Sequence, residues 1–165
     1  MTPIRNWMIT YQRHLAAEPW ALMPLRLLVG FGLAAHGYAK LTRGVSFFAA
    51  TLAAMDIPAP TTTAWLTTLL ELVGGIAILL GAYVAPLALP FIAIMLTAML
   101  GVHLPYGFSS IKLKAITAAG PEFGPPGIEI NLLYIAALLA LACSRPTPWS
   151  IDRARRRKRM EIEPT

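Results

Sequence analysis

Long apolar runs separated by polar or proline-rich segments dominate the pattern of this chain. Four of these runs have about the 20 residues that a helix needs to cross the roughly 30 Å hydrocarbon core of a bilayer. A spanning helix satisfies its own backbone hydrogen bonds, so the pattern predicts an all-α membrane protein, a four-transmembrane-helix bundle. The predicted spans are 21–41, 63–81, 83–103 and 127–144.

The two connections predicted to lie outside the membrane are long. The first, 42–62, contains FFAATLAAMD, whose bulky apolar residues fall near one helical face before the breaker IPAP. These residues are Phe47, Phe48, Leu52 and Met55. The pattern predicts a short interfacial helix on the outer surface. The second connection, 104–126, is rich in Gly and Pro and less regular, and we expect it to cover the mouth of the bundle.

The amino-acid composition also indicates a membrane protein. Of its 165 residues, 56% are hydrophobic and only 13% are charged, and the mean hydropathy is +0.60. A soluble domain has about 25% charged residues. We therefore expect three parts: a cytoplasmic N-terminal segment at 1–20, a transmembrane domain at 21–144 and a basic cytoplasmic tail at 145–165.

The distribution of Lys and Arg predicts the orientation. With four spans both termini lie on one side of the membrane, which then carries nine Lys and Arg residues against four on the other. The positive-inside rule places the richer side, and with it both termini, in the cytoplasm. The richer side carries Arg5, Arg13, Arg145, Arg153, Arg155, Arg156, Arg157, Lys158 and Arg159, and the other side carries Lys40, Arg43, Lys112 and Lys114.

The basic run RARRRKR at 153–159 has two interpretations. Such a run is a candidate nucleic-acid patch. Directly beyond a last membrane span, however, it more simply binds anionic lipid headgroups. We therefore expect the lipid bilayer as a partner and no nucleic acid.

Ionisable and amide side chains inside the spans are the candidate functional residues. A cation at the bilayer centre costs roughly 2.5–3.5 kcal/mol, so such residues are expected to face the bundle interior and find partners there. In the predicted topology most of them share the outer half of the bundle, where they would form one polar pocket. The predicted ligand-binding residues are Arg26, His36, Lys40, Glu71, His103, Glu129 and Asn131.

Helical geometry supports this convergence. At 100° per residue, Arg26, His36 and Lys40 fall within an arc of about 80° on one face of the first helix. Glu71 is the candidate counter-ion and proton relay, and the Gly-Gly pair at 74–75 lets a neighbouring helix approach closely beside it. Its partner is Arg26 or His36, between which the sequence does not decide.

Each of these positions also has a structural interpretation. Arg26 and Lys40 can extend to the two membrane surfaces, and an Arg26–Glu71 pair can simply fasten two helices. Glu129 in a first helical turn is favoured by the helix dipole whether or not it takes part in chemistry. His103 at a helix end suits the membrane interface.

One acid, histidines and cations among aromatic side chains suit a quinone headgroup, which needs donors to its carbonyl oxygens and a proton acceptor. A small anion or weak acid in transit suits the same site. Axial haem ligation by His36 and His103 is disfavoured because no attachment motif supports it. No metal is expected without an HExxH motif or a cysteine cluster, and the single cysteine, Cys143, has no second thiol in the chain for disulfide exchange.

Five segments of the chain occur in the order and spacing of a known family. They are RLLVGFGLAAHGYAKL, FFAATLAAMDIPAP, ELVGGIAILLGAY, MLTAMLGVHLPYGF and GIEINLLYIAALLAL. On these segments the chain resembles the DoxX family of small four-helix bacterial membrane proteins, over about 24–152. At its end SRPTPWSID keeps the serine and aspartate of the family's closing pattern, as Ser150 and Asp152, but not its glycines. The loop that ends in GPEFGPPG also departs from the shorter family version.

The resemblance implies a multi-pass protein of a bacterial inner membrane that is a quinone-linked or redox-associated subunit. Relatives include subunits associated with a terminal quinol oxidase and with a thiosulfate:quinone oxidoreductase, so the partners it implies are other membrane redox subunits or further copies of the chain. We expect no built-in cofactor, with quinone as the possible ligand. The residues at family motif positions are Arg26, His36, Gly37, Lys40, Leu41, Glu71, Gly74, Gly75, His103 and Glu129.

The leading functional hypothesis is quinone or small redox-ligand binding in the outer half of the bundle, within a larger complex. Glu71 would relay protons, His36 and His103 would hydrogen-bond the ligand, and Arg26 and Lys40 would balance charge. The alternative is a non-catalytic scaffold or assembly subunit whose buried charges only hold helices together. A small-solute transporter is disfavoured, because four short helices without an inverted repeat leave little room for alternating access.

Overall fold

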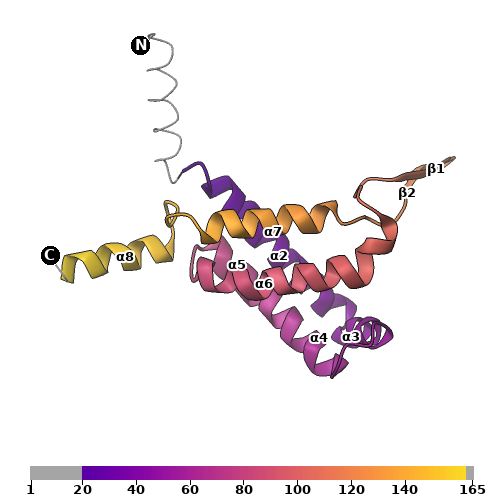
Figure 1. Cartoon of the computed structure of the whole chain (residues 1–165), viewed down its shortest axis with the longest axis horizontal. Coiled ribbons are helices and arrows are strands. Elements are labelled where there is room, and N and C mark those ends of the chain that lie inside the picture. Colours follow the sequence, from indigo (N-terminus) through magenta and orange to yellow (C-terminus); the bar gives the residue numbers. More distant parts are fainter. Residues whose placement is uncertain (1–19, 163–165) are drawn as a thin grey trace, which may run out of the picture.

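The computed structural model describes residues 20–162 and is mostly helical (Figure 1). Of the predicted N-terminal segment 1–20, all but Trp20 lies outside the described residues. The helices are α2 (Met23–Arg43), α3 (Val45–Ala54), α4 (Pro60–Leu69), α5 (Gly75–Leu79), α6 (Val84–Ala98), α7 (Glu129–Ala142) and α8 (Ile151–Ile162). The π-helical turn η1 (Leu70–Gly74) joins α4 to α5, and the π-helical turn η2 (Met99–His103) and the 3-10 turn η3 (Leu104–Tyr106) extend α6.

All four predicted spans contain helices, but in the described chain two helices are long and apolar enough to cross a membrane. They are Pro60–Leu79 and Val84–Tyr106. Helix α2 has 21 residues but carries the cations Arg26, Lys40 and Arg43, and α7 has 14 residues, or about 21 Å of helix. Crossing by all four helices therefore stays a prediction.

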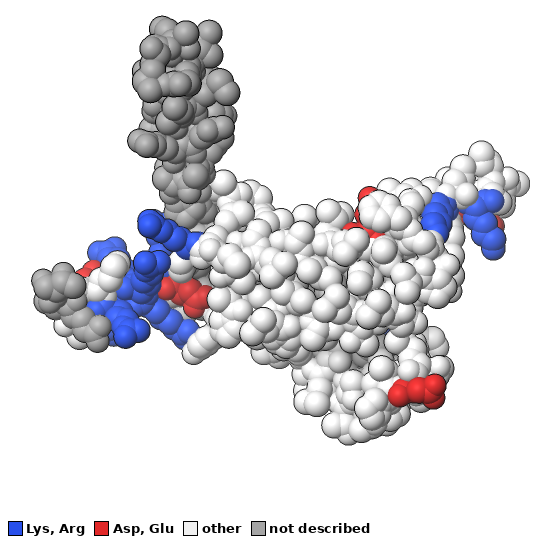
Figure 2. Space-filling model, in the orientation of Figure 1, with Lys and Arg blue, Asp and Glu red and all other residues white. Residues whose placement is uncertain are grey.

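The helices pack as two pairs around an apolar core. Helix α2 crosses α5 and η1, α6 lies along α7, and α2 also contacts α7 (Figure 1). The buried core consists of Val29, Leu33, Ile78, Ala88, Phe91, Ala137, Leu138 and Leu141. Many large apolar side chains remain exposed, and Figure 2 shows an almost uncharged surface between two charged ends. Such a surface suits lipid or partner helices better than water.

The predicted short helix in the first connection is confirmed as α3. Val45, Ala49 and Leu52 are buried against Ala64 of α4, whereas Phe47 is 71% exposed. The buried positions recur at i, i+4 and i+7, which is one stripe of a helix, and the small Ala49 leaves room for α4. The interfacial position of α3 stays a prediction.

Connection 104–126 contains a β-hairpin that the sequence pattern did not indicate, so the fold is not purely helical. Strand β1 (Leu113–Thr117) pairs antiparallel with β2 (Gly120–Phe123). Gly120 has a φ of +116°, a conformation that residues with a Cβ rarely adopt. The glycines that suggested an irregular loop mark the turn and the base of the hairpin, where Gly124 N–H donates to the Lys112 carbonyl at 2.8 Å.

Candidate functional site

The carboxylate of Glu71 is buried and paired with Lys40. The Lys40 Nζ lies 2.7 Å from Oε1 and 2.6 Å from Oε2 of Glu71. The Glu71 side chain is 3% exposed and that of Lys40 is 23% exposed. The Lys40 Nζ also lies 4.2 Å from the centroid of the Phe48 ring, at cation–π distance. The two partners considered from the sequence, Arg26 and His36, are therefore wrong for Glu71.

Glycines bring the two helices of this pair into backbone contact. A Cβ at Gly37 would overlap the backbone of Leu72, and a Cβ at Gly75 would overlap the backbone of Ala34. The close approach predicted at 74–75 is thus confirmed, with small residues on the facing helix as well. Side chains cannot separate helices where glycine backbones touch, so the crossing fixes which residues meet across it.

The position along α2 at which the two helices touch explains why Lys40 is the partner of Glu71. Gly37 lies at the backbone of Glu71 and Leu72, and Lys40 follows within one helical turn. Arg26 lies about 21 Å from Lys40 along the helix axis. His36 shares a face with Lys40 but is exposed, outside the ion pair. Arg26, His36 and Lys40 therefore lie on one face of α2, but only Lys40 pairs with Glu71.

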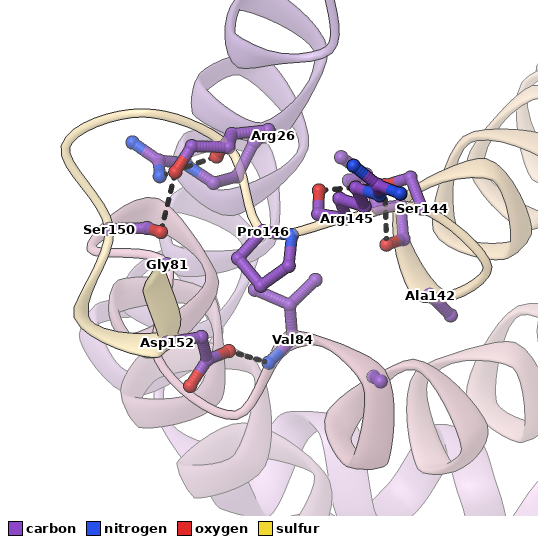
Figure 3. A pocket seen from close by; sticks show the side chains of 12 residues that line it. Arg26, Gly81, Val84, Ala142, Ser144, Arg145, Pro146, Ser150 and Asp152 are labelled. Atoms are coloured by element: carbon purple, nitrogen blue, oxygen red, sulfur yellow. Dashed lines mark hydrogen bonds between the residues drawn. The ribbon is translucent and has the colours of Figure 1, made fainter. Parts of the chain in front are cut away.

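Arg26 instead binds the loop between α7 and α8, as Figure 3 shows from close by. Its Nη1 donates to Thr147 Oγ1 at 2.7 Å and to the Pro148 carbonyl at 3.2 Å, and its Nη2 donates to the Trp149 carbonyl at 3.3 Å. Arg26 is 2% exposed. These acceptors are neutral, so Arg26 serves as a hydrogen-bond hub for the loop and lies far from the other predicted ligand residues.

Asp152, in the first turn of α8, is partly buried and was not selected as a site residue from the sequence. Its two carboxylate oxygens accept hydrogen bonds from the backbone N–H groups of Tyr83 and Val84, both at 3.0 Å. Figure 3 shows the bond from Val84. These N–H groups begin α6 and have no partner within their own helix, so Asp152 caps α6 from a distant segment. The retained Ser150 and Asp152 of the family's closing pattern were the signal that could have identified this role.

Glu129 and His103 hold the base of the hairpin connection. Glu129 Oε2 accepts from the Ser110 backbone N–H at 2.9 Å, and Ser110 Oγ accepts from the Ile130 N–H at 3.0 Å. The His103 Nδ1 lies 3.0 Å from the Pro126 carbonyl oxygen, to which it donates. Both residues thus anchor connection 104–126.

Asn131 lies apart from the other predicted residues, between α7 and α6. It is 4% exposed, and its Nδ2 donates to the Met95 carbonyl at 3.4 Å. Its Oδ1 has no hydrogen-bond partner in the described chain. The structure therefore brings Lys40 and Glu71 together, places His103 and Glu129 at one connection, and leaves Arg26, His36 and Asn131 separate.

Comparison with known proteins identifies the family. The DoxX family model matches residues 21–104, just over half of the 165 residues. The chain belongs to the DoxX family. Neither the curated proteins nor the solved structures gave a significant match. Family membership together with the two apolar spans makes this chain a membrane protein, and the matched range includes both residues of the Lys40–Glu71 pair.

The cavity beside Arg26 in this DoxX protein is too small for a quinone headgroup. Its volume is about 60 Å³, and its lining includes Arg26, Val84, Ser150 and Asp152 (Figure 3). Typical small-molecule sites have roughly 300–1,000 Å³. The hydrogen bonds around this cavity go to backbone groups and hydroxyls of the chain itself, which is the arrangement of a structural junction.

Among residues 20–162, no three His, Cys, Asp or Glu side chains gather in a way that could hold a metal ion. The predicted site residues whose side chains meet are Lys40 and Glu71. The Lys40 ammonium gives two of its three N–H donors to Glu71 and places its charge over Phe48, so both charges are satisfied within the protein.

Proposed function

We propose that this DoxX protein is a non-catalytic assembly subunit of a membrane redox complex. One observation carries the proposal: the buried charges found partners within the chain, at separate places, rather than around a shared cavity. Arg26 binds the loop before α8, and Lys40 neutralises Glu71. Buried charges that are paired and hydrogen-bonded fix the register of helices without needing a ligand.

The exposed surface supports the same function. Large apolar side chains face outward from α2, α4 and α6, including Phe31, Leu66 and Leu89. A rigid crossing at the glycine contacts holds these faces in one relative orientation, as docking of neighbouring subunits requires. The redox character of the complex rests on the resemblance to subunits of quinone-linked oxidoreductases.

The test is purification from native membranes in mild detergent, with bound quinone quantified by mass spectrometry of an organic extract. The proposal expects co-purifying membrane subunits and only background quinone. A Glu71→Gln variant should lower the thermal stability of the bundle, whereas Glu122→Gln, on the exposed strand β2, should leave it unchanged. Near-stoichiometric quinone, lost in Glu71→Gln, would overturn the proposal.

Quinone binding at the ion pair is the second candidate, favoured by the partial exposure of Lys40. Glu71 is 3% exposed, but Lys40 keeps 23% exposure beside the Phe48 ring. A quinone carbonyl could approach Nζ from this exposed side, with the ring against Phe48 and Glu71 as proton acceptor. Here Lys40→Gln should abolish quinone retention, whereas Lys114→Gln, on exposed β1, should retain it. Equal quinone contents in the two variants would reject this candidate.

We further propose a four-span topology in a bacterial inner membrane, with both termini in the cytoplasm. The support is the excess of Lys and Arg at the α8 end, together with the apolar surface between the charged ends (Figure 2). The single cysteine, Cys143, is exposed near this end. A membrane-impermeant maleimide should label Cys143 in inverted vesicles and leave it unlabelled in intact spheroplasts.

A matched variant reports on the opposite side of the membrane. Cys143→Ser combined with Ala118→Cys places the only thiol in the exposed turn between β1 and β2. This variant should label in spheroplasts and not in inverted vesicles. Labelling of both positions from the same side would refute the topology.

A further inference from the structure

The basic helix α8 and the loop before it form an open groove at one end of the molecule. The groove has a volume of about 550 Å³. It is lined by Trp149, Ser150, Arg153, Ala154, Arg157, Lys158 and Glu161. Three cations thus face it with one carboxylate, and that carboxylate already accepts a hydrogen bond from Arg157 Nε at 3.0 Å. The groove keeps a net positive charge.

We propose that this groove binds the headgroup of an anionic phospholipid. Guanidinium and ammonium groups suit a lipid phosphate, the Arg fork by paired hydrogen bonds and the Lys as a point charge. The volume falls in the range of small-molecule sites, and Figure 2 shows Lys and Arg gathered over this end of the chain.

The position of Trp149 favours a membrane lipid over a soluble anion. Its side chain is 78% exposed and packs edge to face on Trp20, with ring centroids 5.2 Å apart. Exposed tryptophans are enriched at the level of lipid headgroups, where an amphipathic ring contacts both water and lipid. The groove therefore combines phosphate-binding cations with an aromatic side chain typical of that interface.

The bundle holds the groove in place through the same contacts that stabilise the α8 end. Trp149 has a left-handed backbone conformation, with a φ of +49°, and its carbonyl accepts from Arg26. The Ile151 N–H donates to the Leu80 carbonyl at 3.3 Å, and the Asp152 N–H donates to the Gly81 carbonyl at 2.9 Å. Lipid binding should therefore raise the stability of the whole bundle.

The experiment compares phosphatidylglycerol with phosphatidylcholine on the full chain, by native mass spectrometry of the detergent-solubilised protein. The test variant is Arg153→Gln, Arg157→Gln, Lys158→Gln. The control variant removes the same charge from the opposite end, by Arg43→Gln, Lys112→Gln, Lys114→Gln.

Wild type and the control variant should both bind phosphatidylglycerol in preference to phosphatidylcholine. The apparent affinity of the test variant for phosphatidylglycerol should fall roughly tenfold to a hundredfold, because each basic residue near an anionic membrane surface contributes about fivefold. Phosphatidylglycerol should also raise the melting temperature of wild type, and high salt should reduce this effect. The rise should be absent from the test variant.

Several outcomes would overturn the proposal. These are equal binding of both lipids, equal losses in the two variants, and displacement of phosphatidylglycerol by millimolar inorganic phosphate, which would indicate a soluble-anion site. Tighter binding of a single-stranded RNA oligomer would assign the surface to nucleic acid. If the test variant does not fold, the proposal is tested on wild type by measuring its preference for phosphatidylglycerol at increasing salt concentration. A preference that does not change with salt would reject a site based on charge.

Discussion

The two ends of this molecule use buried charge in different ways. At the α3 end, one cation meets one anion, Lys40 and Glu71, across a glycine contact. At the α8 end, the buried Arg26 binds neutral groups of the loop before α8, and the partly buried Asp152 accepts from backbone N–H groups, with Arg155 4.0 Å from its Oδ1. Replacing Lys40 therefore leaves an uncompensated charge at the first end, whereas replacing Arg26 leaves only unpaired dipoles at the second. The difference teaches that the first junction depends on charge balance and the second on hydrogen-bond geometry.

The largest effect is expected for Lys40→Met, because it leaves the Glu71 carboxylate buried without a counter-ion. The free energy of unfolding should fall by about 3 kcal/mol, the lower end for a broken buried pair, since Lys40 is partly exposed. The double variant Lys40→Met, Glu71→Leu should regain most of this loss. Denaturant unfolding in detergent micelles measures both, and a double variant as unstable as the single one would contradict charge imbalance as the cause.

Arg26→Met should cost less, about 2 kcal/mol, because it removes hydrogen bonds to neutral acceptors and leaves no opposite charge behind. The same unfolding measurement applies. Arg145→Met is the matched control, because Arg145 lines the same cavity but is exposed. If Arg26→Met proved more damaging than Lys40→Met, the contrast between the two ends would be reversed.

Asp152→Ala should lower the free energy of unfolding by about 1 kcal/mol, the usual cost of losing an N-terminal cap. Asp152→Asn keeps one acceptor oxygen for the N–H groups of Tyr83 and Val84 and should lose less. Hydrogen exchange at these two amides gives a local readout. Unchanged exchange in Asp152→Ala would exclude Asp152 as the cap of α6.

The smallest effect is expected for Glu129→Gln, less than about 1 kcal/mol, because the amide oxygen still accepts from Ser110. The change should be local, as faster proteolysis of the hairpin connection with an unaltered melting temperature. Glu122→Gln, which removes an exposed carboxylate of β2, should not change the proteolysis rate. A large drop in melting temperature for Glu129→Gln would mean that the hairpin base is part of the bundle core.

Sequence patterns located the helices better than they located partners. Apolar runs of sufficient length predicted where helices lie, and the glycine pair at 74–75 correctly indicated a close crossing. The β-hairpin was missed because its alternation is short and its glycines resemble those of an irregular loop. The role of Asp152 was missed because a cap supplied from 68 residues away leaves no local pattern around Val84.

The sequence by itself determined the membrane character, the positions of the long helices and membership of the DoxX family, because apolar length, small residues and motif spacing are properties of a linear chain. Only the tertiary structure decided that Glu71 meets Lys40, that Arg26 binds the loop before α8, and that Glu129 anchors a hairpin. Helical periodicity gives the angle of a side chain around its own axis. Partner choice also requires the level at which two helices touch, and here the backbone contacts of Gly37 and Gly75 set that level.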